Sequence, residues 1–155
     1  MASSTQSTPT ASAHRESPWW RRAARPAAVA LGVLAALAVW MVSELVFGVD
    51  VRQPAFGTQM PKDLTAVPVM TASLIAGLGA WATLALLEPR GRHGRVVWVV
   101  LATLVLLVSL GAPLSGRGID PGSRVVLALL HLTVGALLIV LLARTSRQAT
   151  AGRDR

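Results

Sequence analysis

The sequence predicts an all-α fold, a four-helix transmembrane antiparallel bundle with disordered termini. Hydrophobic residues make up 53% of the 155 residues and charged residues only 14%, whereas a soluble domain carries roughly 25% charged residues. The apolar residues form four continuous runs instead of alternating with polar ones, which favours membrane helices over strands. None of the runs has the polar face that a helix of a soluble protein presents to water.

The four runs have the lengths that a bilayer requires. A helix rises 1.5 Å per residue, so about 20 apolar residues, or 17 at the lower limit, cross a hydrocarbon core of about 30 Å. We expect the helices at about 27–47, 65–87, 96–112 and 125–142. The first run resembles a signal peptide at Ala36–Ala38, but it continues for nine more residues, which favours an uncleaved span.

Turn-forming residues separate the runs. Proline and glycine disfavour helix in the three predicted loops, which are Gly48–Asp63, Glu88–Arg95 and Pro113–Arg124. Because the second loop is short, the helices on either side of it should form a hairpin. The resulting organisation is a disordered basic tail over residues 1–26, a four-span membrane domain over 27–144 and a disordered tail over 145–155.

Basic residues lie mainly on one side of the predicted membrane. Of the 15 lysines and arginines, 11 fall on the side that holds both termini and the Glu88–Arg95 loop, and four fall on the other. The positive-inside rule therefore predicts a multi-pass protein of the cell membrane with both termini in the cytoplasm. The net charge of +8 is thus an orientation signal.

Several of these cations, together with two tryptophans, are predicted to anchor the protein at the membrane surface. Indole rings favour the headgroup level, and arginines attract anionic lipid headgroups. The lipid bilayer is therefore the expected partner, in preference to a nucleic acid or a regulatory role for the tail. The predicted anchors are Trp19, Trp20, Arg21, Arg22, Arg90, Arg92, Arg95 and Arg144.

Two ionisable residues lie inside the predicted spans. Glu44 stands 17 residues after Ala27, about 25 Å along the helix, and His131 lies six residues into the fourth run. Because the first and fourth helices run in opposite directions, both residues fall in the outer half of the membrane. They form the candidate intramembrane polar site, and a Glu–His contact there would titrate protons. The plainer interpretation pairs Glu44 with Arg52 or Arg124. It also gives His131 an interhelical hydrogen bond to a hydroxyl or a carbonyl.

Small residues recur at helical spacing in the second run. Ala72, Ala76 and Ala80 are four residues apart, as are Ser73 and Gly77. Such spacing lets helices approach closely and would also support a homo-oligomer. In the fourth run, Gly135 places a notch one turn below His131, which favours close packing.

The sequence contains no recognisable catalytic or cofactor motif. It has no cysteine, and we find no HExxH, P-loop or GxSxG pattern. The remaining histidines lie outside the spans, so no pair of membrane histidines is available for haem. We therefore expect no cofactor, no metal and no enzymatic activity.

The end of the third run and the fourth run carry a family resemblance, through Ser109, Pro113, Leu114, Ser115, Leu129, His131, Leu132 and Gly135. With the four-span layout and the basic hairpin loop, the chain resembles an uncharacterised actinobacterial family of four-helix integral membrane proteins, a domain of unknown function. The resemblance covers about residues 27–144 and implies the fold without any activity, substrate or cofactor.

Two functions follow as expectations. The first is a structural or partner-binding membrane protein, whose partner is a membrane protein or a second copy of the chain. The alternative is a small proton-coupled transporter in which Glu44 titrates with His131 nearby.

Overall fold

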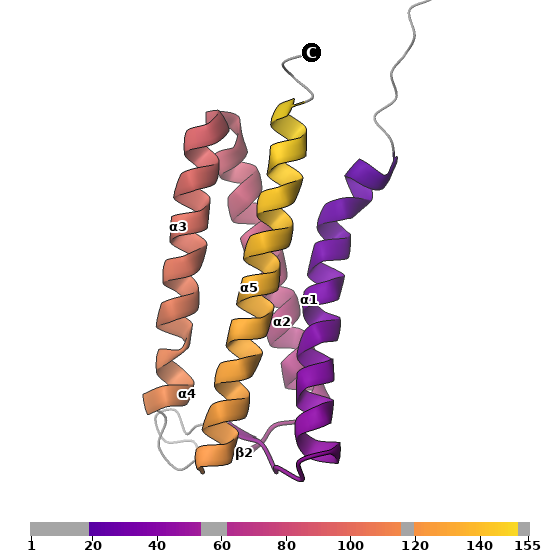
Figure 1. The fold of residues 1–155 in the computed structure, drawn as a ribbon, viewed down its shortest axis with the longest axis vertical. Coiled ribbons are helices and arrows are strands. Elements are labelled where there is room, and N and C mark those ends of the chain that lie inside the picture. Colours follow the sequence, from indigo (N-terminus) through magenta and orange to yellow (C-terminus); the bar gives the residue numbers. More distant parts are fainter. Residues whose placement is uncertain (1–18, 54–61, 116–119, 152–155) are drawn as a thin grey trace, which may run out of the picture.

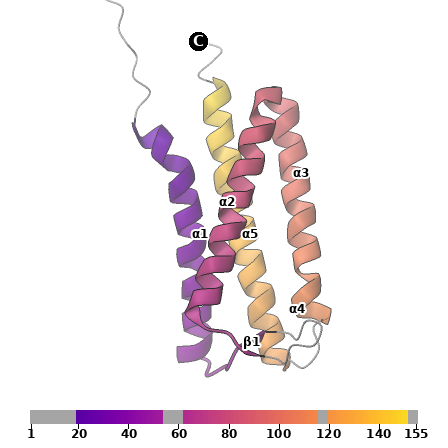
Figure 2. The same ribbon diagram turned by 180° about the vertical axis from the view of Figure 1, so that it is seen from behind.

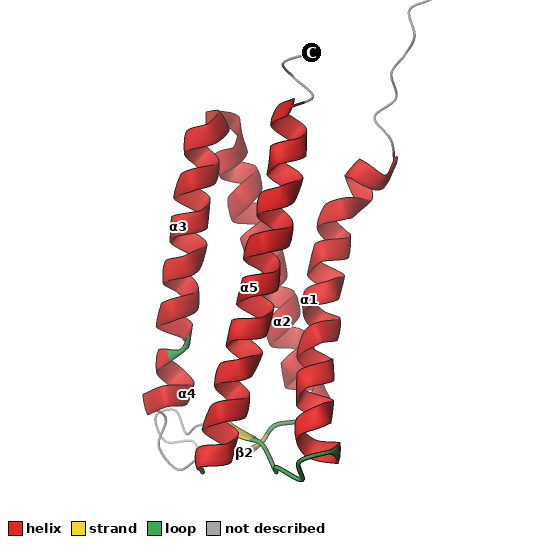
Figure 3. Cartoon of the chain, in the orientation of Figure 1, coloured by secondary structure: helices red, strands yellow, loops and turns green. Residues whose placement is uncertain are grey.

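The structure, a computed structural model, describes residues 19–53, 62–115 and 120–151, and within these ranges it describes side chains from residue 23 to residue 146. The described chain is almost wholly helical (Figure 1, Figure 3). Its elements are α1 (Trp19–Leu45), β1 (Arg52–Gln53), β2 (Lys62–Asp63), α2 (Ala66–Leu87), the 3-10 turn η1 (Glu88–Arg90), α3 (Gly91–Ser109), α4 (Gly111–Ser115) and α5 (Pro121–Ala151).

The long helices run side by side in alternating directions. α2 and α3 form an antiparallel hairpin that is closed by η1, and α5 packs against both α1 and α3 (Figure 1, Figure 2). The beginning of α1, the η1 turn and the end of α5 lie at one end of the bundle. The two-residue strands β1 and β2, which pair antiparallel, lie at the other end.

The helical fold is confirmed, but the predicted count of four spans is not. Three stretches of the described chain are long and apolar enough to cross a membrane, namely Ala23–Leu45, Ala66–Ser115 and Pro121–Ser146. The second stretch has 50 residues because the predicted loop Glu88–Arg95 is itself helical, with η1 leading directly into α3.

The terminal helices are longer than predicted. α1 begins at Trp19 and α5 continues to Ala151, so residues 19–26 and 145–151, which we expected in disordered tails, are helical. Alanine and arginine are strong helix formers and need no apolar partner to extend an existing helix. Pro26 lies inside α1, whose beginning bends away from α5 (Figure 1), as a proline within a helix causes. The predictions for residues 1–18 and 152–155 lie outside the described residues.

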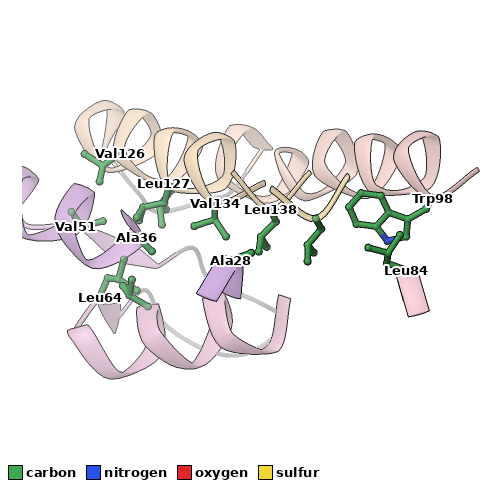
Figure 4. Close-up of a cluster of buried hydrophobic side chains, with 13 residues drawn as sticks. Ala28, Ala36, Val51, Leu64, Leu84, Trp98, Val126, Leu127, Val134 and Leu138 are labelled. Carbon is green, nitrogen blue, oxygen red and sulfur yellow. The ribbon is translucent and has the colours of Figure 1, made fainter. Parts of the chain in front are cut away.

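The core is built along one face of α5. Buried residues recur there every three or four positions, which places them on a single helical stripe: Ser123, Val126, Leu127, Leu130, Val134, Leu138, Leu142 and Ser146. Val51 and Leu64 join the cluster near the strands, and Leu84 and Trp98 join it on the side of the η1 turn (Figure 4). The indole Nε1 of Trp98 donates a hydrogen bond to the carbonyl of Ala80 at 3.0 Å and so ties α3 to α2.

Glycines mark the places where helices approach most closely. A Cβ on Gly77 of α2 would lie 2.8 Å from Cγ1 of Val29 in α1, and a Cβ on Gly135 of α5 would lie 2.5 Å from Cδ1 of Leu106 in α3. Gly77 of the predicted Ser73–Gly77 pair therefore lies at an interhelical contact, in keeping with its small-residue spacing.

The start of α5 is fixed by hydrogen bonds that also secure the preceding loop. Asp120 stands just before Pro121, and its carboxylate accepts from the backbone N–H of Ser123 at 2.9 Å and from the Ser123 hydroxyl at 2.6 Å. The oxygen of that hydroxyl also accepts from the backbone N–H of Arg52 at 3.1 Å. Asp120 is thus the N-cap of α5, and the hydrogen bonds from Ser123 lower the pKa of its carboxyl group.

We expect Gly77→Ala to lower the free energy of unfolding by about 1–3 kcal/mol. The new methyl group would overlap Val29, whose branched side chain has few alternative rotamers. Gly79→Ala is the matched control, since a Cβ there meets nothing within 4 Å and alanine is the better helix former. Denaturation in detergent micelles, followed by circular dichroism, measures both. Equal destabilisation by the two substitutions would contradict the close contact between α1 and α2.

We expect the stability of the α5 cap to depend on acid pH. Because the folded-state pKa of Asp120 lies below its ordinary value of 3.8, its contribution is fully present above that value and is lost as the pH falls through the folded-state pKa. Asp120→Asn should lower the melting temperature at pH 7 and remove this part of the acid dependence. Identical acid titrations of the melting temperature in both proteins would show that ionisation of Asp120 does not stabilise the start of α5.

Candidate functional site

A cleft of about 690 Å³ opens between α2, α3 and α5. Leu127, Leu130, Val134 and Leu138 of the core stripe line it from α5, together with the half-buried His131. α2 and α3 form its two sides, and the short helix α4 contributes Pro113. Volumes of about 300–1,000 Å³ are typical of pockets for small molecules.

The cleft opens sideways because α2 presents small side chains to it. Ala72, Ala76 and Gly79 line the cleft and are exposed, and on the other side Leu101 and Val105 of α3 are also exposed. The predicted alanine stripe therefore faces the cleft, and Ser73 lines the cleft beside it. The alanine positions line an open space, while Gly77 packs against α1.

The hydroxyl groups in the cleft already donate within their own helices. Ser73, Thr83 and Ser109 each donate a hydrogen bond of 2.7 Å to a carbonyl of the preceding turn. Their hydrogens are thus committed, and only their oxygens can still accept. Gln53, from β1, adds an amide to the lining.

His131 is the ionisable residue of the cleft. Its Nδ1 lies 2.7 Å from the carbonyl oxygen of Leu127, one turn earlier in α5. A carbonyl can only accept, so this hydrogen bond requires the proton on Nδ1, and in the neutral ring Nε2 is then an acceptor. The half-buried ring lines the cleft, and Leu106 packs over the notch at Gly135 one turn below it.

Glu44 lies apart from these interactions. It is half-buried in the last turn of α1 and is not among the cleft-lining residues. In the described part of the chain, no side-chain hydrogen bond or ion pair includes its carboxylate. Arg52, one of its predicted partners, pairs with Asp63 at 3.4 Å instead. The structure therefore shows no contact that joins Glu44 to His131.

The predicted surface anchors gather at the end of the bundle that holds the η1 turn. Arg90, Arg92 and Arg95 lie in or beside this turn, and Arg144 lies near the end of α5. The anchors Trp19, Trp20, Arg21 and Arg22 form the first turn of α1, but their side chains lie outside the described part. Arg25 forms an ion pair with Glu88 that links α1 to the turn.

Sequence reasoning missed two interactions that position the helices. The Asp120 cap, which sets where α5 begins, has a readable signal in the order Asp120–Pro121–Gly122–Ser123, because aspartate at the N-cap followed by proline is a helix-start pattern. The hydrogen bond from Trp98 to Ala80 has no such signal, since its two residues meet only when the hairpin closes.

Comparison with known proteins identifies a family but no characterised relative. A family model described as a family of unknown function (DUF6069) matches residues 15–148. No curated protein and no solved structure matches the chain.

Proposed function

The chain belongs to this family of unknown function (DUF6069), and on that premise we propose that it is a multi-pass protein of the cytoplasmic membrane that binds a lipid-soluble partner and catalyses no reaction. The observation that carries this proposal is the apolar cleft between α2, α3 and α5, which opens sideways among exposed apolar side chains.

We infer four crossings of the membrane. The stretch Ala66–Ser115 has 50 residues and would be about 75 Å long as one straight helix, against a hydrocarbon core of about 30 Å. Gly91, with a φ of +63°, stands where the chain reverses, and α2 and α3 lie antiparallel (Figure 2). Two crossings within this stretch support a total of four, and both termini then lie on the same side.

The arginines support a cytoplasmic location for both termini. The end of the bundle with the η1 turn also holds the beginning of α1 and the end of α5, and the side that we assign to it carries 11 of the 15 basic residues. The positive-inside rule assigns such a side to the cytoplasm.

The chemistry of the cleft favours a long apolar molecule that carries a hydroxyl group. The walls are largely aliphatic and the serine and threonine hydrogens are committed to backbone carbonyls, so the polar groups of the lining are mostly acceptors. A ligand hydroxyl can donate to Nε2 of neutral His131, while the aliphatic chain covers the exposed alanines of α2. The opening between α2 and α3 provides entry from the bilayer.

The transporter alternative gains no support from the described contacts. It requires Glu44 beside His131, but Glu44 does not line the cleft and has no described ionic partner. A membrane partner protein or a homo-oligomer stays a prediction from the small-residue spacing.

Reporter fusions test the topology. We expect a cytoplasmic signal from fusions at the C-terminus and after residue 92, and an external signal from a fusion at residue 57. A fusion after residue 92 that reports an external location would contradict the double crossing of Ala66–Ser115.

Photolabelling tests the cleft, with a diazirine-bearing long-chain alcohol and its methyl ether as probes and the purified protein in phosphatidylcholine vesicles. We expect the alcohol to label cleft residues about threefold to tenfold more than the ether, the range that one membrane hydrogen bond provides. His131→Phe should remove this preference and leave the ether labelling unchanged. Peptide mapping by mass spectrometry locates the adducts.

Two matched substitutions on α2 provide the control. Ala76→Leu fills the cleft and should reduce labelling by both probes, whereas Ala82→Leu, at an exposed position outside the cleft, should not. Labelling spread over the outer helix faces, and equal for these two variants, would show that the cleft binds nothing.

A further inference from the structure

A second, smaller groove lies between α1 and α5, near the end of the bundle that holds the η1 turn. It has a volume of about 220 Å³ and is distinct from the cleft beside His131. Ala24, Ala27, Ala28 and Leu31 line it from α1, and Leu141, Arg144 and Thr145 line it from α5. Its floor is therefore aliphatic, and a guanidinium group stands at its edge.

The groove exists because α1 and α5 separate toward the end of the bundle that holds the η1 turn. Ala28 of α1 and Leu142 of α5 are almost fully buried, with exposed fractions of 2% and 0%, so the helices are in contact there. The beginning of α1, which includes Pro26, then bends away from α5 (Figure 1). The alanines on this part of α1 have side chains too short to fill the resulting space.

The groove carries one positive charge without a described counter-charge. Arg144 is exposed, and no acidic group of the described chain forms an ion pair with it. Arg25, the residue after Ala24 in α1, is already paired with Glu88. The hydroxyl of Thr145 donates to the carbonyl of Leu142 at 2.8 Å, which leaves the guanidinium as the group of the groove that can donate to an anion.

We propose that this groove binds one phospholipid with an anionic headgroup, its phosphate on Arg144 and an acyl chain along Leu31 and Leu141. Arg144 stands two residues before the end of the apolar stretch Pro121–Ser146, which is the depth of the headgroups in a bilayer. A basic group above an apolar groove between membrane helices fits both parts of such a lipid. A soluble phosphate would satisfy the charge alone and leave the aliphatic floor uncovered.

Native mass spectrometry of the purified full chain in detergent tests this proposal, with phosphatidylglycerol and phosphatidylcholine of identical acyl chains as probes. We expect one phosphatidylglycerol to bind in preference to phosphatidylcholine. Arg144→Gln should weaken that binding about fivefold, and Arg144→Lys should largely retain it. Arg92→Gln, an exposed arginine at the same end but outside the groove, is the matched control and should bind as the wild type does.

Two further measurements distinguish a bound lipid from a bound phosphate group alone. Ala27→Leu, which fills the groove and retains every charge, should also weaken phosphatidylglycerol binding, and thermal melting without added lipid confirms that each variant is folded. Glycerol phosphate should not displace the lipid. Equal binding by the Arg144→Gln and Arg92→Gln variants, or displacement by glycerol phosphate, would overturn the proposal. The photolabelling of the His131 cleft is independent of these outcomes.

Discussion

α5 holds the bundle together because it packs against both α1 and α3, with its buried stripe in the core and the notch at Gly135 facing α3. α2 is held differently. It packs on α1 through Gly77 and meets α3 near the η1 turn, where Trp98 donates to Ala80, and it touches α5 only over a short region. The cleft forms because α2 is anchored to α1 and α3 and stands away from α5.

The same demand for satisfied hydrogen bonds that makes the chain helical also sets the chemistry of the cleft. In an apolar environment each hydroxyl hydrogen needs an acceptor, and a carbonyl of the preceding turn is the nearest one available. Ser73, Thr83 and Ser109 all follow this pattern, and Nδ1 of His131 does the same toward Leu127. A cleft built in this way has acceptors to offer and few donors, which is why a hydroxyl-bearing ligand suits it.

The two ends of the bundle are organised by different forces. At the end that holds the strands, the Asp120 carboxylate, the Ser123 hydroxyl and the backbone of Arg52 form a network of hydrogen bonds that fixes the loop against α5. At the other end, arginines dominate and one ion pair, between Arg25 and Glu88, links α1 to the hairpin. The end with the strands is thus held by a defined hydrogen-bond network. The end with the η1 turn carries the arginines and the smaller groove, which are the features that our proposed lipid site requires.

From the sequence alone the chain could be recognised as helical, with helices long and apolar enough for a membrane, and as similar to an uncharacterised family. The helical and apolar character follows from local composition and from the spacing of apolar residues, whereas the family was inferred from a resemblance over about residues 27–144 and is shown by the family match over residues 15–148. Helix ends were predicted less well because we took them from the ends of the apolar runs. Trp19–Pro26 and the residues after Leu142 lie outside those runs, yet they continue α1 and α5. The sequence also singled out His131, Gly77 and the alanines of α2 as residues of interest.

What those residues do depends on how the helices pack together. Gly77 and Ala76 lie one position apart in α2, yet the first packs against Val29 and the second lines an open cleft, a difference that depends on where α1 and α5 stand. Glu44 and His131 have similar predicted depths, but depth says nothing about which way each helix is rotated, and the structure places only His131 in the cleft. The rotation of each helix about its axis is set by contacts between distant residues, and local sequence patterns do not contain it.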